Sequence, residues 1–180
     1  MEESSFLHPE AAIRAAKVHE GMRVADFATG SGFFTRAAAR AVGLNGVVWA
    51  VDSNPDLLSR VKNLSIAEGL RNVEVVRGDV EHPGGSSLPP ESFDFCIIAT
   101  VLFAVDDKRA LAHEARRVLK SSTGRALVID WKDSFGGLGP HPDHVVTAPE
   151  AKKIFEDAGF IVTNEIPAGE YHWGFVARKK

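Results

Sequence analysis

Short apolar runs alternate with segments of helical periodicity along the whole chain. Val47 to Val51 is a nearly continuous apolar run, as expected for a strand covered on both faces of a sheet. Patterns of this kind predict strands at 23–27, 47–51, 73–76, 93–99, 125–131, 160–166 and 171–177. Helices are predicted at 9–18, 33–42, from 54–55 onward, at 106–119 and at 149–157. This alternation is typical of βαβ units and predicts a mostly parallel sheet with helices on both faces.

The last two predicted strands are joined differently from the others. Only Pro167-Ala168-Gly169-Glu170 separates them, which is too short for a parallel crossover. The final strand should therefore run antiparallel. We predict an α/β fold, Rossmann-like and doubly wound, with a seven-stranded, mostly parallel sheet and an antiparallel last strand. A length of 180 residues suits one domain, 1–180, in which 1–20 form an N-terminal helical cap segment.

Composition and charge narrow the class of protein. The formal net charge is −3, which does not suit a general nucleic-acid binder, although a local basic patch for RNA stays open. The opening residues 1–5 are acidic and polar, unlike a signal peptide, and no apolar run approaches the ~20 residues of a membrane span. We therefore expect a cytoplasmic protein. The single cysteine, Cys96, lies in an apolar run and is interpreted as a small buried side chain rather than a nucleophile.

Residues with potential binding chemistry follow the predicted strands. Asp26 and Gly30-Ser31-Gly32 end the first strand, Asp52 ends the second, Gly78-Asp79 the third and Thr100 the fourth. In doubly wound sheets, ligands bind at these carboxyl ends, and glycine lets the backbone approach a ligand closely. A carboxylate at Asp52 can accept hydrogen bonds from ribose hydroxyls, and one at Asp79 from an adenine amino group. Each signal alone is common, but their combination is much more specific.

At this point a family resemblance can be stated. Asp26-Phe27-Ala28-Thr29-Gly30-Ser31-Gly32 resembles the Asp-x-Gly-x-Gly-x-Gly motif of class I S-adenosylmethionine (SAM) dependent methyltransferases. The chain is most similar to small members such as the ubiquinone/menaquinone-biosynthesis and arsenite-type enzymes, from about residue 9 to 178. Residues 78–80 resemble the adenine-side motif, and 149–160 resemble the family's late helix with its Gly-Phe exit.

The resemblance implies SAM as methyl donor and an SN2 transfer to an acceptor. It also implies a set of SAM-binding residues, which we list together: Asp26, Ala28, Thr29, Gly30, Ser31, Gly32, Asp52, Ser53, Gly78, Asp79, Val80 and Thr100.

The chain also departs from the family pattern. Ala28 stands where the first glycine of the motif is expected, which adds a methyl group near the path of the cosubstrate. Residues 99–102 read Ala-Thr-Val-Leu and lack the Asn-Pro-Pro-Tyr type motif, which argues against methylation of adenine or glutamine amino groups. The paired or triple cysteines of arsenite methylation are missing, so that substrate is not expected.

No catalytic residue can be assigned from the sequence. Candidate bases share a position near the end of the fifth strand or before the first helix; they are His141, His144, Asp130, Asp133 and His8. The histidines fit a solvated loop equally well, and a metal site at His141, Asp143 and His144 is only a weak alternative, so we expect no metal. Trp131, Phe135, Tyr171 and Trp173 suit either an acceptor pocket or core packing. Surface positions are predicted for His82, His113, Arg116-Arg117 and Arg178-Lys179-Lys180.

Two other functions stay open. A nicotinamide-dependent oxidoreductase would need Gly-x-Gly-x-x-Gly, and here Thr35 stands at the third glycine. A non-catalytic SAM-binding module would carry the same motifs. The expected acceptor is a small molecule, with nucleic acid and protein acceptors still possible, and the sequence leaves the oligomeric state open.

Overall fold

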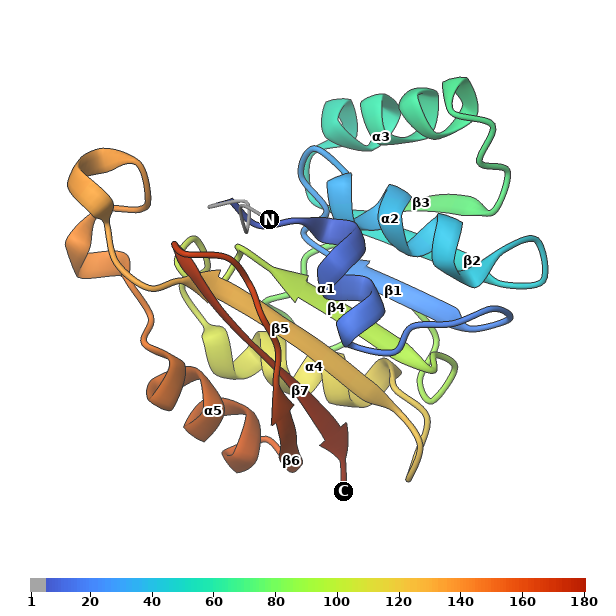
Figure 1. Ribbon diagram of the computed structural model, residues 1–180. Helices are drawn as coiled ribbons and strands as arrows, with labels where there is room; N and C mark the ends of the chain where they lie inside the picture. The colour runs from blue at the N-terminus through green and yellow to red at the C-terminus, as the bar shows by residue number, and fades with distance from the viewer. Residues whose placement is uncertain (1–5) are drawn as a thin grey trace.

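The computed structural model describes residues 6–180, and its centre is a seven-stranded sheet (Figure 1). The strands are β1 (Arg23–Phe27), β2 (Val47–Asp52), β3 (Val73–Arg77), β4 (Phe95–Ala99), β5 (Arg125–Trp131), β6 (Phe160–Glu165) and β7 (His172–Lys179). The helices are α1 (Pro9–Ala15), α2 (Phe33–Val42), α3 (Pro55–Ala67), α4 (Lys108–Val118) and α5 (Ala148–Asp157). Two short 3₁₀ turns, η1 (Phe135–Gly137) and η2 (Pro142–His144), interrupt the predicted loop before α5.

The strand order is β3-β2-β1-β4-β5-β7-β6. The pairs from β3 across to β5 are parallel, and β7 pairs antiparallel with both β5 and β6. The prediction of an antiparallel last strand is therefore confirmed, because the short connection makes β7 fold back between its neighbours. The winding reverses between β1 and β4, which puts the switch point of the sheet at the carboxyl ends of these two strands.

Side chains that alternate along the strands form one apolar core on each face. On one face Ala25 and Cys96 pack with α4 and α5, and on the other Val24 and Phe95 pack with α1, α2 and α3. Cys96 is fully buried as predicted, and burial raises the pKa of its thiol well above the usual value. Helices on both faces leave only the strand ends available for a ligand.

The helix boundaries follow their capping residues. The Asn54 side chain accepts from the Asp56 backbone N–H at 2.9 Å and begins α3, with Pro55 in the first helical position as predicted. Asp107 caps α4 in the same way by accepting from the Ala110 N–H, so the helix begins at Lys108, two residues later than predicted. β4 is shorter than the strand predicted at 93–99, because Phe93 forms only an isolated bridge before it.

The N-terminal cap segment is partly described. α1 ends three residues earlier than predicted and packs against α2, and Arg125 Nη1 holds the helix end by donating to the Ala16 carbonyl at 3.0 Å. Residues 1–5, which carry the acidic and polar start, lie outside the described part of the chain. Between residues 6 and 180, no helix is long and apolar enough to cross a bilayer.

Arg117 and Lys179, which were predicted on the surface, are less exposed than expected. Arg117 is only partly exposed and pairs with the buried Glu114. Lys179 is 4% exposed, and its ammonium donates to the Leu119 carbonyl at 2.7 Å. The prediction was wrong at these positions because partners distant in the sequence supply the hydrogen bonds that make burial of a charge tolerable.

Candidate functional site

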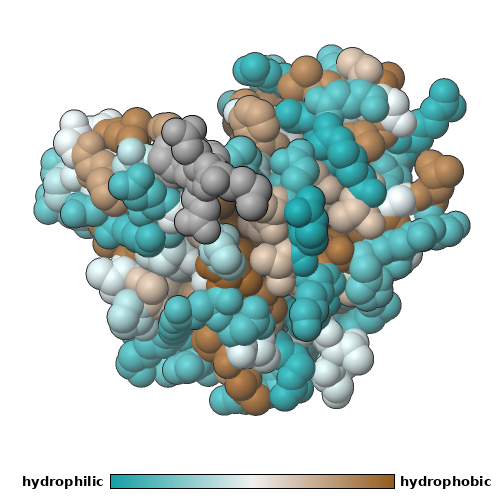
Figure 2. Space-filling model, in the orientation of Figure 1, coloured by the Kyte–Doolittle hydropathy of each residue, from teal (hydrophilic) through white to brown (hydrophobic). Residues whose placement is uncertain are grey.

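A cleft of about 440 Å³ opens at the carboxyl edge of the sheet, at the switch point between β1 and β4. Its walls are Asp26 with the turn 28–34, residues 99–100 at and just after the end of β4, and Leu7 and Pro9 at the start of α1. In the space-filling view the upper edge of the molecule rises into two lobes, and hydrophobic residues are exposed in the middle of the face below them (Figure 2). Such a volume suits a cosubstrate or small ligand.

The turn after β1 has left-handed backbone at three positions. Ala28, Gly30 and Gly32 have φ values of +52°, +53° and +72°. At Gly32 a Cβ would lie 2.7 Å from Val61 Cγ2, whereas at Gly30 the nearest atom would be 3.9 Å away. Gly32 is therefore required by packing against α3, and Gly30 leaves open space beside the cleft. Ala28 adopts a conformation that costs about 1–2 kcal/mol for a residue with a Cβ.

Asp26 lies at the bottom of the cleft and is 2% exposed. Its Oδ2 accepts from the Thr35 hydroxyl at 2.5 Å and the Thr29 hydroxyl at 3.1 Å, and the two threonine hydroxyls contact each other. Burial raises the pKa of Asp26 to about 6, against the lowering effect of these hydrogen bonds, and the nearby charge of Asp52 raises it further. Thr35, which the sequence pattern showed only as a replacement for the third glycine of Gly-x-Gly-x-x-Gly, is thus a hydrogen-bond partner of the buried Asp26.

Asp52 joins the ends of the first strands. Its Oδ2 accepts from the Gly30 backbone N–H at 3.0 Å, and its Oδ1 accepts from the Asn54 N–H at 2.9 Å. The Asp52 carbonyl accepts from the Gly78 N–H at 3.0 Å. The structure therefore brings the glycine turn, Asp52 at the end of β2 and the Gly78 segment together, although they are far apart in the sequence.

The segment after β3 is more open. Asp79 is exposed, and its carboxylate accepts from the Glu81 N–H at 3.0 Å and lies 2.9 Å from His82 Nδ1. Val80 is buried and Ser53 is exposed. These residues and Asp52 lie beside the cleft and are not among the residues that line it.

Asp130 supports the turn after β4. It is fully buried, and its carboxylate accepts from the Leu102 N–H at 2.7 Å and the Trp131 N–H at 2.8 Å. Burial raises its pKa to about 6, partly offset by these backbone hydrogen bonds. Thr100, with a φ of +55°, begins this turn and lines the cleft, whereas Asp130 does not. The arrangement gives Asp130 a supporting position behind the cleft wall.

The candidate histidines lie apart from the cleft. His141 and His144 are exposed around η2, and His144 lines a separate hollow with Asp143 and Val105. His141 Nδ1 lies 3.4 Å from an Asp143 oxygen, and across residues 6–180 no three His, Cys, Asp or Glu side chains gather as a potential metal site. His8 and Asp133 are also exposed and do not line the cleft, and His82 and His113 are exposed as predicted.

Aromatic rings form a cluster next to the cleft wall. The Tyr171 ring packs against Phe6 at 5.3 Å and edge-on against Phe135 at 4.9 Å between centroids, and Phe6 precedes the wall residue Leu7. Trp173 instead stacks on the core residue Phe175 and donates to a backbone carbonyl, so its place is in the core.

Sequence reasoning missed His172. This side chain is 4% exposed, lies 4.2 Å from the Trp131 ring between centroids, and has a buried Nδ1 without a hydrogen-bond partner. Burial, with a contribution from the positive charge of Lys132, lowers its pKa to about 4. The signal for burial was the alternation along β7, which puts His172 on the same face as Gly174 and the buried Val176.

Comparison with known proteins decides the family. A family model described as a methyltransferase domain matches residues 24–122, which is more than half of the chain. The chain belongs to the class I SAM-dependent methyltransferases. Its fold is similar to a crystal structure of a SAM dependent methyltransferase from Aquifex aeolicus, with a TM-score of 0.88, 29% identity and coverage of 98% of this chain and 92% of that one.

Related sequences point to the same family. The ubiquinone/menaquinone biosynthesis C-methyltransferase UbiE of Burkholderia vietnamiensis is 32% identical over 119 residues, covering 66% of this chain and 47% of that protein. The protein of the same name from Cellvibrio japonicus is 30% identical over 162 residues, covering 88% of this chain and 61% of that protein. The methyltransferase domain thus spans about half to three fifths of the length of these relatives. Membership of the family sets the oxidoreductase alternative aside, with SAM as the family's cosubstrate.

Proposed function

We propose that this methyltransferase domain transfers the methyl group of SAM to a small-molecule acceptor by SN2 displacement. The observation that carries the proposal is the hydrogen bond between Gly30 and Asp52, which joins the glycine turn to a carboxylate at the edge of a cleft of about 440 Å³. This contact supports a nucleoside-binding site next to the switch point of the sheet.

The residues at the strand ends fit the parts of SAM. Each oxygen of Asp52 accepts one backbone N–H and keeps a lone pair for the ribose hydroxyls. Asp79 and Val80 are assigned to the adenine ring, with the carboxylate accepting from the amino group and the valine packing on the ring face. Asp26 is assigned to the positively charged methionine end, because it is the buried acid of the cleft lining. Gly30 and Ser31 present backbone without a large side chain between these two ends.

Methyl transfer from SAM requires little from the protein beyond alignment of the acceptor with the methyl group. SAM supplies a sulfonium, which is already a good leaving group. A rigid cleft can then contribute roughly 7–11 kcal/mol by orienting the acceptor in line with the methyl group. A general base is needed only for an acceptor that must lose a proton early. Asp130 already accepts from backbone N–H groups. His141 and His144 stay candidates for a general base, but they are exposed and would have to approach the acceptor from outside the cleft.

The lining of the cleft favours a small, largely apolar acceptor. Leu7, Phe33 and Phe34 form its outer wall, and Phe33 is 62% exposed. A net charge of −3 gives no general attraction for a polyanion such as RNA. The relatives named above carry a biosynthetic C-methyltransferase name, which is compatible with a small acceptor. A cytoplasmic location stays a prediction that cell fractionation would test.

Calorimetry followed by a turnover assay tests the proposal. We expect heat of binding for SAM and for its demethylated product, and none for NAD. Labelled SAM, offered with phenols, quinols, amines and carboxylic acids, should then label at least one acceptor class. NAD binding without SAM binding would contradict the proposal. Binding of SAM without transfer to any class would favour the non-catalytic module.

A further inference from the structure

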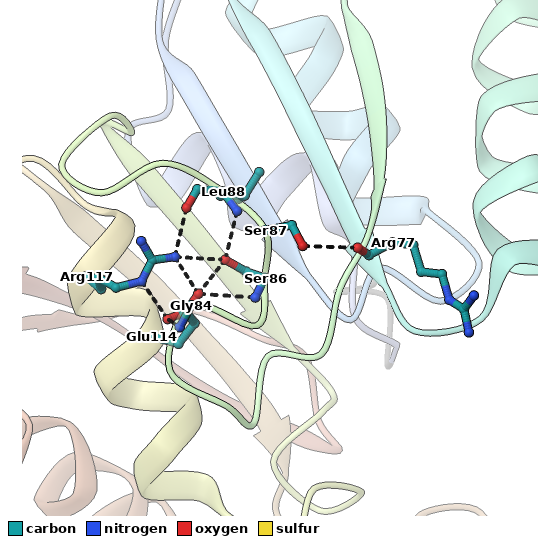
Figure 3. Close-up of polar contacts among 7 residues, drawn as sticks. All are labelled: Arg77, Gly84, Ser86, Ser87, Leu88, Glu114 and Arg117. Atoms are coloured by element: carbon teal, nitrogen blue, oxygen red, sulfur yellow. Dashed lines mark hydrogen bonds and ion pairs between the residues drawn. The ribbon is translucent and has the colours of Figure 1, made fainter.

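A helix on one face of the sheet holds the loop between β3 and β4. Glu114 in the middle of α4 is 1% exposed, and its carboxylate points into the loop, as Figure 3 shows. The Gly84 backbone N–H donates to Oε2 at 2.8 Å. Ser86 donates to Oε1 twice, from its backbone N–H at 3.2 Å and from its hydroxyl at 2.5 Å. One carboxylate therefore fixes three donors of the loop.

Arg117 completes this arrangement one helical turn later. It donates to both Glu114 oxygens at 2.8 and 2.7 Å, and to the Leu88 carbonyl at 2.8 Å (Figure 3). Burial raises the pKa of Glu114, but hydrogen bonds from Arg117, Ser86 and Gly84 outweigh it and bring the pKa to about 2. Buried ion pairs of this kind are often no more stabilising than apolar side chains of similar volume. A role for the pair beyond global stability is therefore worth testing.

The loop packs directly on the segment after β3. The Gly85 carbonyl accepts from the Asp79 N–H at 2.8 Å. A Cβ on Gly78 would lie 2.7 Å from the carbonyl oxygens of Gly85 and Ser86, and one on Gly85 would lie 2.1 Å from the Asp79 carbonyl oxygen. No side chain separates the two stretches of backbone. Any shift of residues 84–86 must therefore be transmitted to Asp79.

We propose that Glu114 is a positioning residue for the adenine end of SAM. It contacts no substrate itself, and acts by holding residues 84–86, which in turn set the position of Gly78 and Asp79. This inference rests on the proposed function, which assigns Asp79 and Val80 to the adenine ring. Val80 belongs to the same core as Leu88 and α4, so both sides of the proposed subsite depend on this packing.

The test is Glu114→Gln, which keeps the length of the side chain but replaces one acceptor oxygen with a donor that faces the loop. Two quantities are measured: amide hydrogen exchange of residues 78–88, and the dissociation constants of SAM and of adenosine. We expect faster exchange in this loop, together with dissociation constants that rise about ten-fold or more for both ligands. A double variant, Glu114→Leu with Arg117→Met, leaves no unpaired charge and should show the same loss if the single variant folds poorly.

Asp94→Asn is the matched control. Asp94 is a half-buried carboxylate that accepts from the Arg23 N–H at 2.9 Å and the Lys120 ammonium at 2.7 Å, at the opposite edge of the sheet. Its loss should lower the thermal midpoint of unfolding but change the affinity for SAM and adenosine by less than about two-fold.

The outcomes separate this inference from the proposed function. If wild-type protein binds SAM and Glu114→Gln binds it within two-fold despite faster loop exchange, the positioning role is overturned and the proposed function stands. Equal losses of affinity in Glu114→Gln and Asp94→Asn would also overturn it, since the effect would then be one of stability. If the wild-type protein binds neither SAM nor adenosine, the proposed function fails, and the inference fails with it.

Discussion

The backbone N–H of Gly30 donates to the carboxylate of Asp52 over 3.0 Å, across 22 residues of sequence. This bond fixes the open turn after β1 against the end of β2, and it orients an acid that also caps the start of the next segment through Asn54. In the proposed function, the ribose subsite would therefore be formed by the fold before any ligand arrives. Preorganisation of this kind reduces the entropy that binding must overcome.

Replacing Asp52 tests the ribose assignment. Asp52→Ala should weaken SAM binding by ~1–3 kcal/mol, because hydrogen bonds to a charged acceptor are lost. Asp56→Ala is the matched control, since Asp56 is an exposed acid in the first turn of α3. Calorimetry with both variants measures the difference. An unchanged dissociation constant for Asp52→Ala would remove this residue from the site.

The two glycines of the turn should respond differently to alanine. Gly32→Ala brings a methyl group to 2.7 Å from Val61 Cγ2 at a φ of +72°, so we expect the free energy of unfolding to fall by about 1–3 kcal/mol. In Gly30→Ala the nearest atom to the new methyl group is 3.9 Å away, so the variant should cost only about 1 kcal/mol for its left-handed backbone. Because Gly30 lines the cleft, its variant should lose SAM affinity instead. Urea denaturation and calorimetry on both variants test this contrast, which equal stability losses would contradict.

The order of helices and strands, and the edge of the sheet that carries the candidate site, could be predicted from local sequence patterns. Apolar runs located the strands, and the four residues 167–170 were enough to predict the direction of β7. The positions of Asp26 and Asp52 at the ends of β1 and β2 follow the same logic, because carboxyl ends of parallel strands meet at one edge. The structure gathers Asp52 and Gly30 as this rule implies.

Buried polar groups with distant partners could not be predicted in the same way. Glu114 is bound by residues about 30 positions earlier in the chain, and Lys179 reaches back 60 positions to Leu119. The sequence did hold one signal at α4: Glu114 lies three residues after Leu111 and four before Val118, on the apolar side of the helix. A charged residue on such a face indicates a buried partner, but hydropathy alone does not say which.

SAM binding should depend on pH through Asp26. Its pKa is raised by burial to about 6, so the carboxyl is increasingly protonated as pH falls below 6. A bound cation favours the ionised form, so affinity should be constant above about pH 7 and fall by up to about ten-fold per pH unit below 6. Calorimetry between pH 5 and 8 measures the profile.

Asp26→Asn provides the control for this pH profile. The variant should bind SAM weakly at every pH and lose the dependence near 6. Asp130 also has a pKa of about 6, but it does not line the cleft. A slope that persists in Asp26→Asn would therefore assign the titration to another group.

The contribution of these acids to the free energy of unfolding should depend on pH in the opposite direction to SAM affinity. Asp26 and Asp130 both have pKa values near 6 in the folded protein, above the usual 3.8, so the folded state binds protons more tightly than the unfolded chain. Their contribution to stability is fully present below about pH 4 and is lost as pH rises through 6. Urea denaturation of wild type and of Asp26→Asn between pH 4 and 7 should show a smaller decline in the variant. Other acids titrate in this range too, so the difference between the two proteins is the measured quantity.

Asp130 and the two loop histidines should differ in what their loss affects. Asp130→Asn replaces one acceptor facing the backbone N–H groups of Leu102 and Trp131 with a donor, so we expect a loss of about 1–3 kcal/mol in the free energy of unfolding. The double variant His141→Ala and His144→Ala removes two exposed side chains, and its free energy of unfolding should stay within about 0.5 kcal/mol of wild type.

Single-turnover methyl transfer measures whether these histidines act in catalysis. If the variant with His141→Ala and His144→Ala folds and binds SAM normally but transfers methyl at least about a hundred-fold more slowly, a general base acts from the loop. An unchanged rate would leave alignment within the cleft as the source of catalysis, as the burial of Asp130 and the exposure of both histidines lead us to expect.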